Sequence, residues 1–328
     1  MSASFFSDLD LPEPDVNLGI GGGTHTEATA GIMLALEREL ATDRPDLLLV
    51  VGDVNSTLAG ALVAAKLGIP IAHVEAGLRS FDRKMPEEIN RILTDVLSDH
   101  LFATEPSGVG NLLAEGIPRQ KVHLVGNVMV DTLLRFRDRS RSSDVLDRLG
   151  LQPKSYAVVT LHRPSNVDDP ERLRSLIEML EQLQRRVRVV FPVHPRTMQR
   201  IEQCSIRSGL LLVPPMGYLD FLRLMSDARL VLTDSGGIQE ETTILKVPCL
   251  TLRDNTERPI TVEQGTNQLV GVDPARILPV ALDALAREWE VRAPEFWDGK
   301  ASIRILDVLE SAFLPPQREL NRKGITSA

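Results

Sequence analysis

The feature that most constrains this chain is a regular alternation of short apolar runs with longer amphipathic segments. Helical periodicity marks the segments between the runs, for example 87–97, 170–183 and 274–286. Strands that alternate with helices build parallel sheets with helices on both faces, and ligands then bind beyond the carboxyl ends of the strands. The nine runs predicted as strands are 47–51, 69–74, 100–104, 121–125, 156–160, 187–193, 210–213, 230–233 and 248–252.

The length of 328 residues is too great for one ordinary core and predicts two domains with a cleft between them. A polar, charged stretch at 135–147 separates two groups of strands and is interpreted as a hinge region. We therefore expect an α/β fold with an N-terminal Rossmann-like domain over 1–145 and a C-terminal one over 146–300. A last helix at 301–313 is long enough to cross back onto the first domain.

Charge and cysteine content exclude several classes of protein. The formal net charge of −8 argues against general attraction to nucleic acid or to an acidic membrane surface. No window approaches a membrane span of about 20 apolar residues, and the first residues lack a signal-peptide pattern, so a cytoplasmic location is expected. Only Cys204 and Cys249 occur, and their spacing signals neither a disulfide framework nor a metal site.

Three carboxylates follow predicted strands in the first half of the chain. Asp53 could be catalytic or a plain helix cap, and Glu75 could be catalytic or paired with the nearby His73 and Arg79. Glu87 opens a helix, where the helix dipole alone would favour it. Like charges gathered in one cleft raise at least one pKa, which separates acid and base roles at neutral pH. Together the three predict proton-transfer chemistry.

Two histidines beside arginines follow strands in the second half. His162 stands in LHRPSN and His194 in PVHPRT. A lone histidine at a strand end is more often structural, but two beside arginine in adjacent loops favour a site for an anion.

A stronger local signal is the run TDSGGIQEE, in which a strand enters a helix through Ser235, Gly236 and Gly237. Small residues at a helix N-terminus let backbone N–H groups approach a phosphate, although a tight turn without a ligand has the same composition. Glu241, one turn further, could accept hydrogen bonds from ribose hydroxyls. Arg258 in the next charged loop could join the anion site.

Taken in order, the blocks GDVNST, HVEAGLR, PEEINR, GNVMVDT, LHRPSN, PVHPRT, TDSGGIQEE and RDNTERP resemble the non-hydrolysing UDP-N-acetylglucosamine 2-epimerases. The match runs from about residue 45 to beyond residue 267. The resemblance implies a glycosyltransferase-B-like architecture of two Rossmann-like domains around a deep cleft. It also implies a homodimer that binds a UDP-sugar and needs no cofactor.

The resemblance implies an isomerase that interconverts UDP-N-acetylglucosamine and UDP-N-acetylmannosamine. The C2 proton is removed as UDP is eliminated, and UDP then adds back to an enzyme-held glycal. Asp53, Glu75, Glu87 and His162 correspond to the catalytic residues of the family. The substrate-binding positions carried over are Arg91, His194, Phe221, Ser235, Gly236, Gly237, Glu241 and Arg258.

Three departures from the family pattern affect what we expect. The chain lacks the family's first strand with its Gly-Thr-Arg-Pro-Glu motif and the second strand, so we expect an exposed sheet edge. The run 19–25 lacks the Gln or Arg residues that bind a regulatory UDP-sugar in allosteric members, which predicts little activation by substrate. Pro164 and Ser165 stand where many members have Arg-Glu, which bears on sugar specificity.

Three alternatives stay open at this point. The chain could epimerise a related UDP-sugar, such as an oxidised or diacetamido hexose. It could be a glycosyltransferase of the same architecture, although three strand-end carboxylates suit proton transfer better. It could also be a UDP-binding remnant without turnover.

Overall fold

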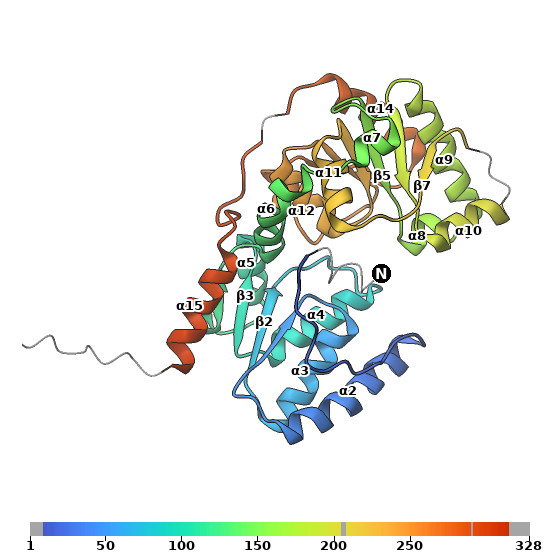
Figure 1. The fold of residues 1–328 in the computed structure, drawn as a ribbon. Helices are drawn as coiled ribbons and strands as arrows, with labels where there is room; N and C mark the ends of the chain where they lie inside the picture. Colours follow the sequence, from blue (N-terminus) through green and yellow to red (C-terminus); the bar gives the residue numbers. More distant parts are fainter. Residues whose placement is uncertain (1–8, 205–207, 290, 315–328) are drawn as a thin grey trace, which may run out of the picture.

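A computed structural model describes residues 9–204, 208–289 and 291–314 of the protein. Two parallel β-sheets, each flanked by helices, lie one above the other in Figure 1. The α/β fold with two parallel sheets that was predicted from the alternation of strands and helices is confirmed.

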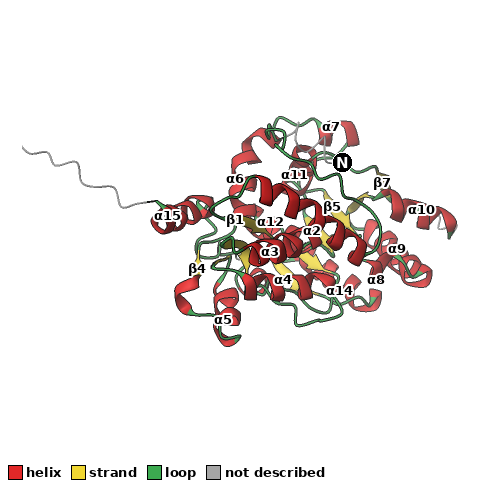
Figure 2. Ribbon diagram, turned by 90° about the horizontal axis from the view of Figure 1, so that it is seen from below, coloured by secondary structure: helices red, strands yellow, loops and turns green. Residues whose placement is uncertain are grey.

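The first sheet has the strand order β1-β2-β3-β4. Its strands are β1 (Leu48–Val51), β2 (Ile71–Ala76), β3 (His100–Ala103) and β4 (Val122–Leu124). The helices of this half are α2 (His25–Thr42), α3 (Asn55–Leu67), α4 (Pro86–Leu97), α5 (Pro106–Ala114) and α6 (Val128–Ser140), with a 3₁₀ turn at Arg119–Lys121. Figure 2 shows α2, α3 and α4 side by side over one face.

The second sheet has the order β10-β9-β8-β5-β6-β7. Its strands are β5 (Tyr156–Thr160), β6 (Arg188–Pro192), β7 (Leu211–Val213), β8 (Leu230–Thr233), β9 (Cys249–Thr251) and β10 (Asn267–Leu269). The helices of this half are α7 (Val145–Leu149), α8 (Pro164–Val167), α9 (Pro170–Gln184), α10 (Pro195–Gln203), α11 (Tyr218–Ser226), α12 (Gly236–Leu245), α13 (Ile260–Glu263) and α14 (Pro274–Ala286).

All nine predicted strands are present, and the structure adds β10. Strands such as β5 and β8 are covered on both faces, so nearly every residue in them is apolar and the run is visible in the sequence. β10 is only three residues long and includes Asn267 and Gln268. Its pairing with β9 comes from tertiary context rather than from an apolar run.

One edge of the first sheet is exposed. Within the described residues β1 pairs with β2 alone. Val50 packs into the core beneath α2 and α3, whereas Leu49 and Val51 on the other face are 44% and 50% exposed. This is the exposed sheet edge expected from the sequence.

The connection between the two halves is more helical than the predicted hinge. Most of the polar stretch at 135–147 belongs to α6 and α7, and α6 packs against α11 and α12 of the second half. The charged side chains of this stretch therefore lie mostly on the exposed face of a helix and do not mark a flexible loop. We propose that the domain boundary lies in the short link at 141–144.

The chain returns to the first domain through α15 (Ala301–Phe313), which lies beside the first sheet in Figure 1. Ile305 of α15 is buried against Val74 and Phe102 of that sheet. The carboxylate of Asp131 in α6 accepts hydrogen bonds from the backbone N–H groups of Ala301 and Ser302. These bonds satisfy donors that the first turn of a helix leaves free.

Candidate active site

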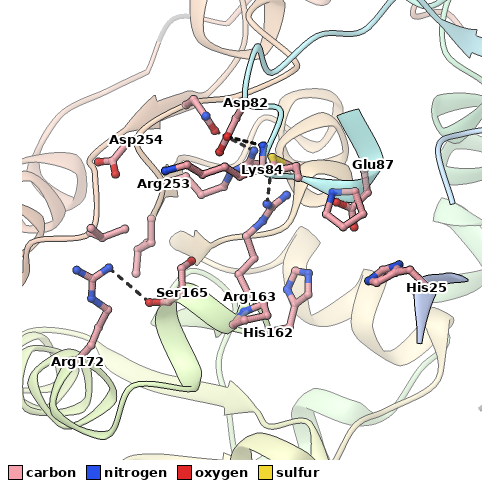
Figure 3. A pocket seen from close by; sticks show the side chains of 16 residues that line it. His25, Asp82, Lys84, Glu87, His162, Arg163, Ser165, Arg172, Arg253 and Asp254 are labelled. Carbon is pink, nitrogen blue, oxygen red and sulfur yellow. Dashed lines mark hydrogen bonds between the residues drawn. The ribbon is translucent and has the colours of Figure 1, made fainter. Parts of the chain in front are cut away.

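A cavity of about 580 Å³ lies between the two domains, at the carboxyl ends of their strands. Glu87, on the first turn of α4, enters it from the first domain. His162 and Arg163, directly after β5, enter it from the second (Figure 3). The structure therefore brings a predicted carboxylate and a predicted imidazole from opposite domains into one space.

His162 is held by a buried carboxylate. Its Nδ1 lies 2.7 Å from Oδ1 of Asp234, whose side chain is fully buried. With Nδ1–H donated to this carboxylate, Nε2 is left for a ligand. Burial raises the pKa of Asp234, but hydrogen bonds from His162, Asn166 and the Arg163 N–H outweigh it and lower the pKa below its usual value. Asp234 is thus a charged acceptor that orients the imidazole.

Two consecutive glutamates on α4 have different surroundings. Pro86 occupies the first turn, where its missing N–H costs nothing. Glu88 is buried and accepts hydrogen bonds from the backbone N–H groups of Ser80 and Phe81, which fixes the preceding loop. Glu87 lines the cavity instead.

Asp53 is bonded to Arg91 rather than acting as a helix cap. Val54 is the N-cap residue of α3, so the alternative that Asp53 is only a helix cap is wrong. The Oδ2 of Asp53 accepts a hydrogen bond of 2.5 Å from Nη2 of Arg91, and Asn90 donates to the Asp53 carbonyl. The pair links the end of β1 to α4.

Glu75 occupies a strained position at the end of β2. Its φ of 74° lies in the left-handed region, and the pairing of β2 with β3 shifts register there. Its Oε1 accepts a hydrogen bond of 2.6 Å from Nη2 of Arg258 in the second domain. The bulge therefore turns this carboxylate across the cleft.

The neighbours of Glu75 in the sequence have a different partner. His73 Nδ1 and Arg79 Nη1 each lie 2.7 Å from the buried carboxylate of Asp95 on α4. The expected alternative, an ion pair of Glu75 with His73 and Arg79, is therefore wrong. His73 and Arg79 thus fix β2 and the loop after it onto α4.

Helix α12 begins directly after Ser235, and its first turn packs against Arg258. A Cβ added to Gly236 would lie 2.4 Å from Nη1 of Arg258, whereas one added to Gly237 would meet open space. Glycine at 236 is thus required for the guanidinium to approach the helix N-terminus. Positive helix-end charge and a guanidinium together favour an anion here.

Further along α12, Glu241 is buried beside α11. Burial raises the pKa of Glu241 to about 7, and the hydroxyl of Tyr218 donates to it over 3.3 Å. Phe221, one turn after Tyr218, is partly buried against the core of the second domain. Glu241 and Phe221 thus belong to neighbouring helices, α12 and α11.

His194 lies apart from these groups. It is exposed and caps α10, where its Nδ1 accepts a hydrogen bond from the Arg196 N–H. The Arg196 side chain pairs with Asp168 over 2.7 Å. His194 is not among the residues that line the cavity of His162, so the structure does not bring the two histidines together.

Sequence reasoning assigned no role to two buried residues of this region. Asp234 and Glu240 both belong to TDSGGIQEE, the block interpreted only through its glycines and Glu241. Asp234 directly follows β8, and His162 lies just beyond the end of β5, the strand that pairs with β8. The adjacency of β5 and β8 is the signal that would have found it, and it requires the strand order.

Two kinds of feature are absent from residues 9–204, 208–289 and 291–314. No helix in these ranges is long and apolar enough to cross a membrane. No group of three or more His, Cys, Asp or Glu side chains within them is arranged to hold a metal ion.

Comparison with known proteins identifies the family. A family model described as UDP-N-acetylglucosamine 2-epimerase matches residues 1–310. The chain belongs to the UDP-N-acetylglucosamine 2-epimerase family. It is 44% identical to the UDP-N-acetylglucosamine 2-epimerase of Methanocaldococcus jannaschii over 94% of this chain and 87% of that protein.

Structural similarity agrees with this assignment. The crystal structure of the Methanocaldococcus jannaschii epimerase in complex with UDP-GlcNAc and UDP matches this chain with a TM-score of 0.88 and 44% sequence identity. The match covers 95% of this chain and 88% of that chain. The predicted glycosyltransferase-B-like architecture is thereby confirmed. A UDP-2,3-diacetamido-2,3-dideoxy-D-glucuronate 2-epimerase of Pseudomonas aeruginosa is also 44% identical, over 94% of this chain and 87% of that protein.

Proposed function

We propose that this 2-epimerase is of the non-hydrolysing type and interconverts UDP-N-acetylglucosamine and UDP-N-acetylmannosamine. The observation that carries the proposal is the meeting of Glu87 and His162 in one interdomain cavity. Asp53 follows β1 and Glu75 lies near the end of the neighbouring β2, so both carboxylates belong to the same edge of the first sheet.

The proposed reaction begins with removal of the proton on C2 by a carboxylate among Asp53, Glu75 and Glu87. The C1–O bond breaks with anti geometry, its electron pair leaves with UDP, and a 2-acetamidoglucal remains. In the second half UDP attacks C1 again while a proton is delivered to the opposite face of C2. Atoms balance without a redox partner, because the substrate and the product are isomers.

Electrostatics must support the departure of UDP. The developing charge on the diphosphate is met by the N-terminus of α12, by Arg258 and by His162, whose orientation Asp234 fixes. Arg91, held by Asp53, orients that carboxylate. Glu241 receives the ribose and Phe221 lies against the uracil, whereas His194 belongs to the nucleotide side only if α10 moves towards it.

Proton NMR of the 328-residue chain with UDP-N-acetylglucosamine in deuterated water tests the proposal. The expected result is appearance of the manno epimer with deuterium at C2. The Glu87→Gln variant should bind UDP and show neither signal. A folded wild-type sample that binds UDP and produces no epimer would sink the proposal and favour a UDP-binding remnant.

A second candidate substrate is a UDP-diacetamido-glucuronate. Its carboxylate would find cations, because Lys84, Arg163, Arg172 and Arg253 line the cavity. The relative from Pseudomonas aeruginosa acts, by its name, on such a sugar. Comparing kcat/KM for the two UDP-sugars distinguishes the candidates, and a preference for the glucuronate that disappears in Arg172→Gln would favour the second.

A further inference from the structure

Arg258 lies at the centre of a cluster of carboxylates from both domains, called here the Arg258 cluster. Its guanidinium is 2.6 Å from Glu75, 2.8 Å from Glu240 and 2.5 Å from Glu257. A fourth member, Glu105 at the N-cap of α5, is fully buried nearby and interacts electrostatically with Arg258. Glu75 and Glu105 come from the first domain, and Glu240 and Glu257 come from the second.

Acidic groups outnumber cations in the Arg258 cluster. Glu257 pairs with Arg253 as well as with Arg258, and Nη2 of Arg253 lies 2.7 Å from its carboxylate. The charge of Glu257 is therefore neutralised by two guanidinium groups. Glu75, Glu105 and Glu240 then have Arg258 as their common cation. Burying uncompensated charge costs several kcal/mol per ion, so such a cluster must retain a proton.

Glu240 is the member with the poorest hydrogen bonding. Its side chain is 1% exposed, and within the described part of the chain neither of its oxygens accepts a well-directed hydrogen bond. Its Oε1 is close to Nε of Arg258, but the N–H bond does not point at it. The other charged groups that act on it are Glu75 and Glu105, both of which disfavour its charge.

The pKa values agree with this geometry. Burial, opposed by Arg258, raises the pKa of Glu240 to about 8. Burial also raises the pKa of Glu105 to about 7, although a hydrogen bond from Ser107 works against it. Around pH 8 the carboxyl of Glu240 is therefore partly ionised, and a further negative charge placed beside Arg258 would protonate it.

Such a charge has an open approach. Arg258 touches the first turn of α12 at Gly236, and the space beyond Gly237 is free. We propose that Glu240 is a positioning residue of the diphosphate site, which holds Arg258 at α12 and takes up a proton when the diphosphate of the nucleotide binds. This inference rests on the proposed function, because it requires UDP at Arg258.

Calorimetry of UDP binding in two buffers of different ionisation enthalpy tests it, because the difference in measured heat counts the protons exchanged. At pH 8.5 the terminal phosphate of UDP is fully ionised and contributes none. We expect an uptake of about half a proton or more per UDP, since a carboxyl with a pKa of about 8 is largely ionised at this pH. Glu240→Gln should abolish the uptake and still bind UDP at pH 7.

Two controls make the assignment specific. Glu178→Gln removes an exposed carboxyl on α9, away from the Arg258 cluster, and should leave the uptake unchanged. If Glu105→Gln abolishes the uptake and Glu240→Gln does not, Glu240 is the wrong residue. Should the amide variant not fold, Glu240→Met offers an uncharged side chain of similar size.

The outcomes separate the inference from the proposed function. Wild-type protein that binds UDP with the same heat in both buffers overturns the inference alone. Wild-type protein that does not bind UDP at pH 7 overturns the proposed function itself. Affinity for UDP that falls from pH 7 to pH 9 in the wild type and stays level in Glu240→Gln supports both.

Discussion

At the scale of single residues, the role of His162 depends on Asp234. Asp234→Asn keeps the size of the side chain but removes the negative charge that favours the Nδ1–H tautomer. We expect kcat to fall about 100-fold, the range typical for a misplaced acid or base, with KM changed less. Steady-state kinetics with a thermal melt of each variant measure this.

Asp254→Asn is the matched control for that experiment. Asp254 also lines the cavity but is exposed and outside the contacts of His162. Its replacement should leave kcat within about threefold. Full activity in a folded Asp234→Asn protein would show that Asp234 is only structural.

The buried carboxyl of Glu241 predicts a pH-dependent stability. Burial holds the pKa of Glu241 at about 7, above its unfolded value, so the unfolded chain loses this proton first as pH rises. The free energy of unfolding therefore falls between about pH 4.5 and pH 7. Glu241→Gln removes this loss, and we expect it to stabilise the protein by about 2 kcal/mol at pH 8 and hardly at pH 5.

Urea unfolding at both pH values measures the difference. Glu263→Gln, on the surface, should change stability equally little at pH 5 and pH 8. A gain for Glu241→Gln that is the same at both pH values would contradict the explanation by burial. The variant should also bind UDP more weakly if Glu241 receives the ribose.

At the scale of elements, the loop after β2 packs tightly on α5. Gly77 has a φ of 82°, and a Cβ there would lie 2.3 Å from the Gly108 carbonyl oxygen. Gly116, at the other end of α5, has a φ of 86° and no atom within 4 Å of the added Cβ. The two glycines share backbone strain and differ in the space available.

Alanine at each position separates strain from steric overlap. Gly116→Ala should cost about 1 kcal/mol, the price of a left-handed alanine. Gly77→Ala must also displace backbone and should cost about 3 kcal/mol. Equal losses in chemical denaturation would mean that the loop after β2 can move away from α5, contrary to the structure.

Elements with strong local signals could be predicted from the sequence. The helix predicted at 170–183 is observed at Pro170–Gln184, because Asp169 caps it and its apolar residues recur at helical spacing. The site was predictable only where residues lie at the end of a strand, as His162 does, or at the start of a helix, as Glu87 does. The partners Asp234, Asp95 and Glu240 could not be assigned, since buried pairing depends on which strands and helices become neighbours.

At the scale of the whole molecule, several contacts cross between the two domains. Glu75 bonds to Arg258, Arg163 lies 3.8 Å from the sulfur of Met85, and Trp297 donates to the Thr104 carbonyl. The first two border the candidate site, whereas Trp297 and helix α6 lie on the connecting side. This arrangement favours a rotation of the two domains relative to each other about the side where the chain passes between them. The cleft would then open and close on the opposite side.

Binding of UDP should therefore close the cleft. The diphosphate attracts Arg258 and the N-terminus of α12 from the second domain and Lys84, which lines the cavity, from the first, so the ligand contacts both domains only in the closed arrangement. Small-angle X-ray scattering should show a smaller radius of gyration at saturating UDP than without it. UMP, which lacks the second phosphate, is the matched control and should produce less change at saturation. Scattering curves that are identical with and without UDP would rule out closure driven by the diphosphate.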